Sequence, residues 1–316
     1  MRKLRRWIQY INMSVMKFYK FRTFTTSYYF PRVTKETRFL YGLYSPFGGL
    51  LSKIYWFLFK NIGIVRSFSQ VDAEKVDFPY ALIKKVDGTD SMLSFNMGSP
   101  GVEQKISILG WDKKERVPFF AKFSQKPKAI ELTKNEIAVY KLLSPTGLVP
   151  KLLDERIDDG YAFLKTDYVK GQRPQSLKLT REIMQLSLMM KDFHLTSCRI
   201  DENGLQMALS HGDFCPWNML EYNGQIRLID WELAADRPLG HDIFTYIIQT
   251  SLLLNPEKHL GEVVEAHEEV IKEYFTTFGI DDYQPYLNDF VKSRCAYEIS
   301  KGNSGRATRL NEILVR

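Results

Sequence analysis

The most constraining feature of the sequence lies at residues 211–232, where an acid, an amide and a second acid follow one another at short intervals. Asp213 precedes Asn218 by five positions, and Asp230 closes the short apolar run of residues 226–229. Between the amide and the second acid there is room for one short hairpin. The pattern therefore predicts a polar loop followed by a hairpin, with Asp230 directly behind that hairpin.

Length and composition indicate a globular protein of two lobes. The chain has 316 residues, of which 44% are hydrophobic and 26% are charged, and this length allows two sizeable cores. Its three cysteines are far apart and include no C-x-x-C pair, which argues against a zinc knuckle or a disulfide framework. Free cysteines favour a reducing, cytoplasmic setting.

The first 72 residues differ in kind from the remainder. Residues 1–60 carry twelve Lys or Arg and one acid, Glu36, and they hold 17 of the 43 aromatic residues. Their apolar stretches are interrupted by polar residues, so none reaches the roughly 18–20 residues that a membrane span requires. No secretory signal is expected either. We therefore treat residues 1–72 as a separate, basic, aromatic and partly helical extension.

The remaining chain is expected to be a β-rich lobe followed by a helical lobe. Hydrophobic alternation predicts strands at residues 90–97, 102–111, 117–124, 148–154 and 161–169, with a helix at 128–143. A hinge at 171–174 leads to helices expected at 179–196, 240–254, 263–278 and 283–299. The expected class is α+β, with an N-terminal lobe at 73–170 and a helical C-terminal lobe at 171–316.

The acid–amide–acid set has the residue types that phosphoryl transfer requires. That reaction needs metal ions on the phosphates, a cation on the phosphate oxygens and a carboxylate that orients the attacking hydroxyl. The five-residue interval equals that of the H-R-D-x-x-x-x-N loop, with Gly212 in place of Arg. Asp213 is therefore the candidate base, and Asn218 and Asp230 are the candidate Mg²⁺ ligands. The alternative, in which each is only a turn residue, is weakened by their occurrence as a set.

Two upstream features are candidates for contact with phosphates. Lys122 lies in an expected apolar strand, where burial without a partner is costly, and Glu136, fourteen residues later, is its candidate partner. The alternative is an exposed lysine and an exposed glutamate. Gly98, Ser99 and Gly101 form a turn whose backbone N–H groups could face phosphates, although an ordinary hairpin turn has the same composition. The sequence contains neither G-x-x-x-x-G-K-[ST] nor G-x-G-x-x-G.

Taken together, these residues resemble the aminoglycoside phosphotransferase and choline kinase group of small-molecule kinases, over about residues 78–300. The resemblance implies a bilobal, protein-kinase-like fold that uses ATP or GTP with Mg²⁺ and transfers the γ-phosphate to a hydroxyl. It implies that Asp213 is the base, and that Asn218 and Asp230 hold the metal. Lys122, paired with Glu136, would contact the phosphates.

The resemblance also places the nucleotide's base at a hinge strand. Residues 165–169, among them Asp167 and Val169, would hold the adenine through their backbone. The chain further resembles bacterial members that have the Gly-Ser-Pro-Gly turn and are linked to the assembly of cell-surface polysaccharide. The acceptor stays open between a sugar, an aminoglycoside and an amino alcohol.

Three hypotheses follow from the sequence. The first is a cytoplasmic kinase of a small molecule, and the second is a non-catalytic, kinase-like protein that only binds ATP. The third concerns residues 1–72, which either lie on the anionic inner face of a membrane or pack onto the small lobe. In the first case the acceptor would be a lipid-linked glycan or a lipopolysaccharide precursor. Nucleic acid is not expected as a partner, because no binding motif accompanies the positive charge.

Overall fold

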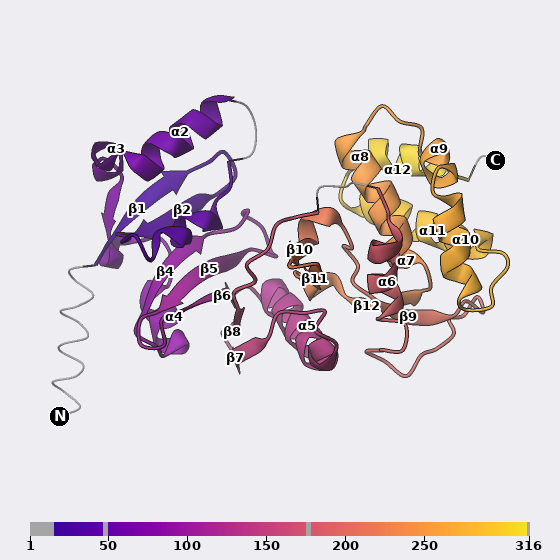
Figure 1. Cartoon of the computed structure of the whole chain (residues 1–316), viewed down its shortest axis with the longest axis horizontal. Coiled ribbons are helices and arrows are strands. Elements are labelled where there is room, and N and C mark those ends of the chain that lie inside the picture. The colour runs from indigo at the N-terminus through magenta and orange to yellow at the C-terminus, as the bar shows by residue number, and fades with distance from the viewer. Residues whose placement is uncertain (1–15, 47–49, 175–177, 315–316) are drawn as a thin grey trace. The chain divides into compact units, whose positions relative to one another are not determined.

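The structure, a computed structural model, describes residues 16–46, 50–174 and 178–314. The chain divides into two compact units (Figure 1). The N-terminal unit comprises Met1–Lys134 and Leu152–Tyr168, and the C-terminal unit comprises Asn135–Lys151 and Val169–Arg316. The expected α+β class, with a β-rich first part and a helical second part, is confirmed. Residues 135–151 group with the helical unit, whereas the sequence placed them in the first lobe.

An eight-stranded antiparallel sheet forms the centre of the N-terminal unit, in the order β3-β1-β2-β4-β5-β6-β8-β7. Its strands are β1 (Lys17–Arg22), β2 (Ser27–Pro31), β3 (Gln70–Asp72), β4 (Ser91–Asn96), β5 (Lys105–Asp112), β6 (Val117–Ser124), β7 (Leu152–Asp158) and β8 (Tyr161–Asp167). The five strands expected from residue 90 onward are all present. The fourth of these begins at Leu152 and extends to Asp158 instead of ending at 154.

The described part of the extension belongs to this same sheet. Strands β1 and β2 form a hairpin, β2 pairs with β4, and β3 pairs with β1. Two helices, α2 (Leu50–Asn61) and α3 (Gly63–Ser67), lie over β1 and β2 (Figure 1). The expectation of a separate unit is therefore wrong for residues 16–72, because their strands complete the hydrogen bonding of the sheet edge.

Aromatic side chains fill the cores that pack against β1 and β2. One cluster joins Phe21 and Phe30 of the hairpin to Trp56 and Phe59 of α2, with ring centroids of Phe21 and Phe59 5.0 Å apart. A second cluster packs Phe18 against residues of β4, β5 and β6. Large rings bury much apolar surface each, so the aromatic content of the extension is explained in part by packing.

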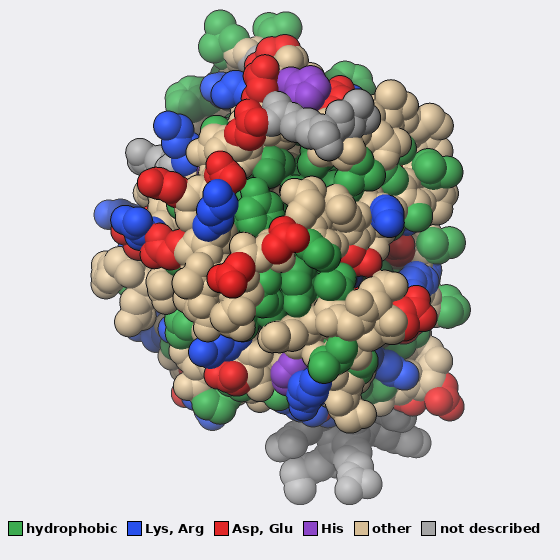
Figure 2. Space-filling view, turned by 90° about the vertical axis from the view of Figure 1, so that its right-hand side faces the viewer, with side chains coloured by type: hydrophobic (Ala, Val, Ile, Leu, Met, Phe, Trp, Pro, Cys, Tyr) green, Lys and Arg blue, Asp and Glu red, His purple; other side chains and the backbone are tan. Residues whose placement is uncertain are grey.

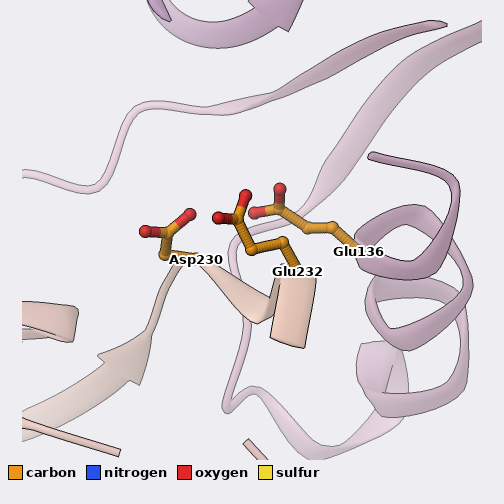
Figure 3. Close-up of side chains that lie close together, drawn as sticks. All are labelled: Glu136, Asp230 and Glu232. Atoms are coloured by element: carbon orange, nitrogen blue, oxygen red, sulfur yellow. The ribbon is translucent and has the colours of Figure 1, made fainter. Parts of the chain in front are cut away.

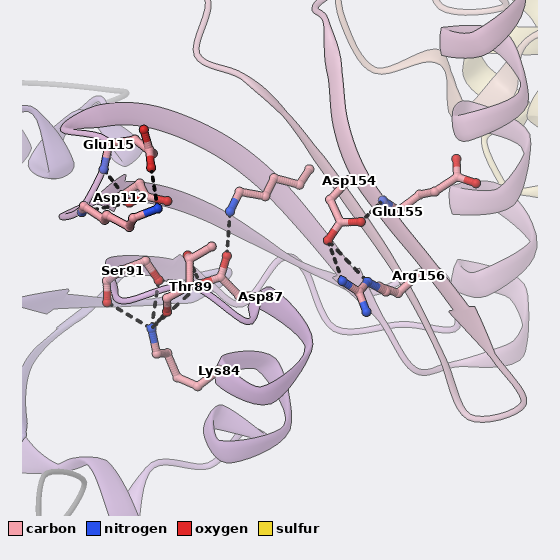
Figure 4. A network of polar contacts seen from close by, with 11 residues as sticks. Lys84, Asp87, Thr89, Ser91, Asp112, Glu115, Asp154, Glu155 and Arg156 are labelled. Atoms are coloured by element: carbon pink, nitrogen blue, oxygen red, sulfur yellow. Dashed lines mark hydrogen bonds and ion pairs between the residues drawn. The ribbon is translucent and has the colours of Figure 1, made fainter. Parts of the chain in front are cut away.

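A buried ion pair ties helix α4 (Tyr80–Asp87) to the sheet (Figure 4). Lys165 Nζ of β8 lies 2.8 Å from Asp87 Oδ1, and both side chains are almost fully buried. Lys84 Nζ lies 3.7 Å from Asp87 Oδ2 and donates to Ser91 Oγ at 2.8 Å. Thr89 donates to the same carboxylate oxygen at 2.8 Å. Asp87 thus meets two ammonium groups and two hydroxyl donors.

The C-terminal unit contains two small two-stranded sheets and most of the helices. The strands are β9 (Met207–Ser210), β10 (Met219–Tyr222), β11 (Gln225–Leu228) and β12 (Ala235–Pro238), with β10 paired to β11 and β9 to β12. The helices are α6 (Arg181–Leu188), α7 (His241–Phe244), α8 (Thr250–Leu254), α9 (Leu260–Glu265), α10 (Glu268–Thr276), α11 (Gln284–Ser300) and α12 (Ser304–Asn311). Helix α5 (Pro127–Leu143) runs from the N-terminal unit into this one.

Three expected helices differ from the observed ones. The helix expected at 179–196 ends at Leu188, and the chain continues in turns to β9. The one expected at 240–254 is α7, a π-helical segment η6 (Thr245–Gln249) and α8 in succession. The one expected at 263–278 is divided into α9 and α10 by a break at residues 266–267. Among the helices in the described ranges, none combines the length and apolar character that crossing a membrane requires.

Candidate active site

Asp213 lies in the loop that joins β9 to the short 3-10 helix η4 (Pro216–Asn218). Asp242, at the start of α7, holds this loop from behind. Its carboxylate accepts hydrogen bonds from the backbone N–H of His211 at 2.8 Å and of Gly212 at 3.2 Å, and from Ser210 Oγ at 2.7 Å. Burial opposes ionisation of Asp242, but the contacts with His241 and His211 outweigh it and lower its pKa. Asp242 therefore braces the loop of Asp213.

His211 connects the loop of Asp213 with the chain before Asp230. Its ring is fully buried, and Nε2 lies 2.9 Å from the carbonyl oxygen of Ile229. A carbonyl oxygen only accepts, so Nε2 carries the proton and Nδ1 can accept from the backbone N–H of Asp213, at 3.3 Å. The ring also packs on Trp231, with centroids 4.4 Å apart. His211 is thus a structural residue.

The position after His211 requires glycine. Gly212 has a φ of +82°, in the left-handed region, and a Cβ there would lie 2.4 Å from the carbonyl oxygen of Leu233. Such a contact is too short for any side chain to be accommodated without moving backbone. This explains why the chain has Gly at the position where the H-R-D loop has Arg.

Three side-chain N–H groups hold the carboxylate of Asp213. Its Oδ2 accepts from Asn218 Nδ2 at 2.8 Å and from Trp217 Nε1 at 3.3 Å, and its Oδ1 accepts from Gln249 Nε2 at 2.7 Å. Asp213 itself is only partly buried. The structure therefore brings Asp213 and Asn218 together and adds Gln249, which the sequence did not indicate.

Gln249 reaches Asp213 from the π-helical segment η6, 36 residues further along the chain. Single π-helical turns occur often at functional sites. No local motif surrounds this glutamine, so only the fold reveals its place beside the candidate base. Its Oε1 is buried and has no hydrogen-bond partner among the described residues.

Cys215, between the candidate base and the candidate metal ligand, is not a nucleophile. Its side chain is fully buried, and burial, followed by the negative charge of Asp213, raises the pKa of its thiol far above the usual range. Alkylation of this thiol is therefore not expected in the folded protein.

The hairpin β10–β11 places Asp230 beside Asn218. Met219 pairs with Leu228, and the backbone N–H of Ile229 donates to the carbonyl oxygen of Asn218 at 3.0 Å. Asp230 follows with a φ of +70°, a left-handed conformation that costs a non-glycine residue energy. The hairpin predicted between the amide and the second acid is therefore present, and it ends in a strained aspartate.

Three carboxylates gather around Asp230. One oxygen each from Glu136, Asp230 and Glu232 lies within 4.8 Å of the other two. Figure 3 shows the three groups pointing toward the same space from α5, from the chain behind β11 and from the short helix η5 (Trp231–Leu233). Asn135 fixes this arrangement, because its Nδ2 donates to the carbonyl oxygens of Glu232 and Ala234 at 3.0 and 2.8 Å.

This donor set fits a hard divalent cation. Oxygen ligands are those that Mg²⁺ and Ca²⁺ prefer, and carboxylates this close repel one another unless a cation or a proton intervenes. Burial, and then the charges of Glu136 and Asp230, raise the pKa of the neighbouring Tyr140 well above its usual value.

The remaining candidates belong mainly to the N-terminal unit. Lys122 lies in the middle of β6, between Ser107 of β5 and Leu164 of β8, and is 7% exposed. Gly98 and Gly101 lie in the turn between β4 and β5, together with the exposed Ser99. Gly98 has a φ of +64°, and a Cβ there would lie 2.5 Å from the carbonyl oxygen of Lys105.

The two candidates for adenine contact flank the division between the units. Asp167 is the last residue of β8, and its carbonyl oxygen accepts from Thr166 Oγ1 at 3.1 Å. Val169 is the first residue after this strand to belong to the C-terminal unit. Lys122 and Glu136 likewise lie in different units, so their pairing stays a prediction.

In structure, the chain is similar to solved small-molecule kinases. A putative fructosamine-3-kinase from Haemophilus somnus is 11% identical, with 74% of this chain and 96% of that one covered and a TM-score of 0.46. An aminoglycoside phosphotransferase from Streptomyces rimosus is 13% identical, with 74% and 97% covered and a TM-score of 0.42. An amicoumacin kinase, solved with AMP-PNP and Ca²⁺, is 14% identical, with 54% and 70% covered and a TM-score of 0.41.

No protein-family model matches the sequence, and no curated protein is significantly similar to it. The structural matches are to proteins of the kind that the motifs resemble, at low identity. We therefore argue the function from the side chains of the site itself.

Proposed function

We propose that the protein is an ATP-dependent phosphotransferase that transfers the γ-phosphate to a hydroxyl group of a small molecule. The proposal rests on the partly exposed Asp213, whose carboxylate accepts a hydrogen bond from Asn218 at 2.8 Å. His211, in the same loop, bonds to the carbonyl oxygen of Ile229, directly before Asp230. A base, an amide and an acid in this order meet the requirements of phosphoryl transfer.

Asp213 would accept the proton of the attacking hydroxyl. Asn218, Trp217 and Gln249 donate to its carboxylate, and the thiol of Cys215 also bonds to it. Because Asp213 is only partly buried, we expect its carboxylate to be accessible to the acceptor's O–H. The acceptor oxygen then forms a bond to the γ-phosphorus, the bond from that phosphorus to the bridging oxygen breaks, and ADP leaves with its electron pair.

The carboxylates around Asp230 would hold the divalent cation. Asp230 and Glu232 provide oxygen donors close together, and the amide of Asn218 has an oxygen left because its Nδ2 donates to Asp213. When bound, Mg²⁺ would supply positive charge to the phosphate oxygens. The chain's own part is to fix these donors, through Asn135 and through the hairpin β10–β11.

The N-terminal unit would hold the nucleotide. A buried ammonium such as that of Lys122 requires an anionic partner, and we assign it the phosphates of ATP together with Glu136. The backbone of the turn with Gly98, Ser99 and Gly101 would cover the phosphates. The backbone at Asp167 and Val169 would hold the adenine. The proposed place of action is the cytoplasm, where ATP is available.

The acceptor class is a sugar, an aminoglycoside or an amino alcohol, with a role in cell-surface polysaccharide metabolism as the more specific proposal. Exposed acidic residues of α9, α10 and the following turn would attract a cationic acceptor. Figure 2 shows acidic side chains interspersed with basic and hydrophobic ones. The acidic residues concerned are Glu262, Glu265, Glu268, Glu269, Asp281 and Asp282, all of them exposed.

The test is transfer of labelled γ-phosphate from Mg²⁺-ATP across a panel of these three acceptor classes, with the full chain. Asp213→Asn should reduce turnover by about 10²–10⁴-fold while ATP binding is kept. Glu202→Gln changes an exposed acid of the same unit that lies outside these acidic residues, so it is the matched control and should behave like the wild type. Binding of ATP without transfer to any acceptor would instead establish a non-catalytic, kinase-like protein.

A further inference from the structure

Helix α2 is apolar on both of its sides. Trp56 and Phe59 are buried against the β1–β2 hairpin. On the opposite side, Leu50, Leu51 and Phe57 are exposed, the last two at 83% and 61%. Residues 50, 54 and 57 follow the helical period and therefore lie along one stripe. A surface helix normally has a polar outer side, so this second apolar side calls for a partner.

Further exposed apolar residues follow α2 in the chain. Ile62 and Ile64 are exposed, and Phe68, directly after α3, is 88% exposed. Scattered single hydrophobic residues are normal on a protein surface, whereas several within one short segment indicate an interaction site. We name this group the α2–α3 surface, and its members are Leu50, Leu51, Ile54, Phe57, Ile64 and Phe68.

Positive charge accompanies this surface. Lys53 and Lys60, seven residues apart, lie along one side of α2. Between residues 16 and 72, the sequence has nine Lys or Arg and only two acids, Glu36 and Asp72. Glu36 is already paired with Arg116. The complementary partner is therefore anionic and presents apolar surface as well.

We propose that the α2–α3 surface docks on the surface of an anionic lipid bilayer. Helices that lie in the membrane interface have an apolar side with Trp, Phe or Leu and basic residues beside it, which is the composition of α2. The helix has 12 residues, too few to span a bilayer, so it would lie in the plane of the interface. A second copy of the chain fits less well, since a symmetric contact would bring the same lysines face to face.

The proposal does not depend on the proposed kinase activity, because it concerns a surface of the N-terminal unit alone. It would, however, bring an enzyme of this kind to acceptors that are carried on lipids. Binding strength should rise with anionic lipid content and fall with salt, because salt screens the attraction between the lysines and the anionic lipids.

The experiment is flotation of the full-length protein with vesicles of phosphatidylcholine alone or with added phosphatidylglycerol, at low salt. The wild type should float with the anionic vesicles, and Leu51→Glu/Phe57→Glu should weaken this binding by about tenfold or more. Leu153→Glu/Ile157→Glu is the matched control, because these residues of β7 are apolar and 45% and 48% exposed. This control should bind like the wild type.

Two results would overturn the proposal. The first is binding that is equal in the wild type and in Leu51→Glu/Phe57→Glu, or absent in both, while circular dichroism shows that each is folded. The second is a dimer of the wild type, seen by light scattering, that dissociates in the same variant and does not bind vesicles. That outcome would assign the surface to a second copy of the chain.

Discussion

The molecule has one cluster of buried or half-buried charged side chains around Asp87 and another around Asp230. The two clusters differ in the sign of the charges that surround the aspartate. Asp87 meets the ammonium groups of Lys165 at 2.8 Å and Lys84 at 3.7 Å (Figure 4). Asp230 lies beside two further carboxylates, those of Glu136 and Glu232 (Figure 3). Opposite charges within one cluster stabilise the fold. Like charges are costly to bring together, and a fold keeps them where a cation is to bind.

The largest expected effect is on catalytic activity, and it should differ between substitutions in the two clusters. Asp230→Asn should lower phosphate transfer by about a thousandfold or more, because it removes a ligand of the cation that stabilises charge in the transition state. Asp87→Asn should leave the turnover of the folded protein within about twofold, as this residue belongs to the packing of α4. The measurement is steady-state turnover per folded molecule. Equal losses in both variants would abolish the distinction between the clusters.

The loss of stability, in contrast, should be larger for Asp87→Asn than for Asp230→Asn. Breaking a buried ion pair from one side typically costs about 3–5 kcal/mol, so Asp87→Asn should lower the free energy of unfolding by about that amount. Asp230→Asn relieves repulsion between carboxylates and should leave the unfolding free energy unchanged or slightly raised. Urea denaturation of both variants in the absence of divalent cations measures this. A larger loss in Asp230→Asn would contradict the comparison.

The contribution of Asp87 should also depend on pH. Burial opposes ionisation of Asp87, but its bonds to Lys165, Ser91 and Thr89 outweigh burial and lower its pKa. A carboxyl whose pKa is lower in the folded state stabilises the fold above its unfolded-state pKa, about 3.9, and loses this effect as the pH falls through the folded-state value. The difference in stability between wild type and Asp87→Asn should therefore shrink below about pH 4. A constant difference down to pH 2 would argue against the ion pair as its source.

The smallest effect is expected at Gln249. Gln249→Met keeps the side-chain length but removes the hydrogen bond to Asp213 Oδ1. One such bond to a charged group is worth about 1.5–3 kcal/mol, so kcat should fall by about tenfold or somewhat more while KM for ATP stays constant. An unchanged kcat would limit Gln249 to packing.

The sequence was most informative where the chemistry is local. The interval between Asp213 and Asn218, and the hairpin before Asp230, are short-range features, and the structure has both. Gln249 could not be found this way, because it reaches Asp213 from 36 residues away through a π-helical turn. Glu136 and Glu232 also meet only through the fold, where Asn135 binds the chain behind Asp230.

The extension was the least predictable part of the fold. Residues 17–31 are rich in basic and aromatic residues, and they contain no turn signal as strong as Asn-Gly that would indicate a hairpin. They nevertheless pair as β1 and β2, since the edge of β4 offers hydrogen bonds and the aromatic rings fill a core with α2. Tertiary packing thus decided the structure of this segment, as it often does for strands.

Calorimetric titration with Mg²⁺ and a non-hydrolysable ATP analogue tests the central claim most directly. The claim is that the carboxylates around Asp230 form the cation site of a phosphotransferase. Wild type and Asp87→Asn should bind the analogue in a Mg²⁺-dependent manner, and Asp230→Asn should lose that dependence. Mg²⁺-dependent binding of equal strength in Asp230→Asn, with the protein folded, would contradict the account.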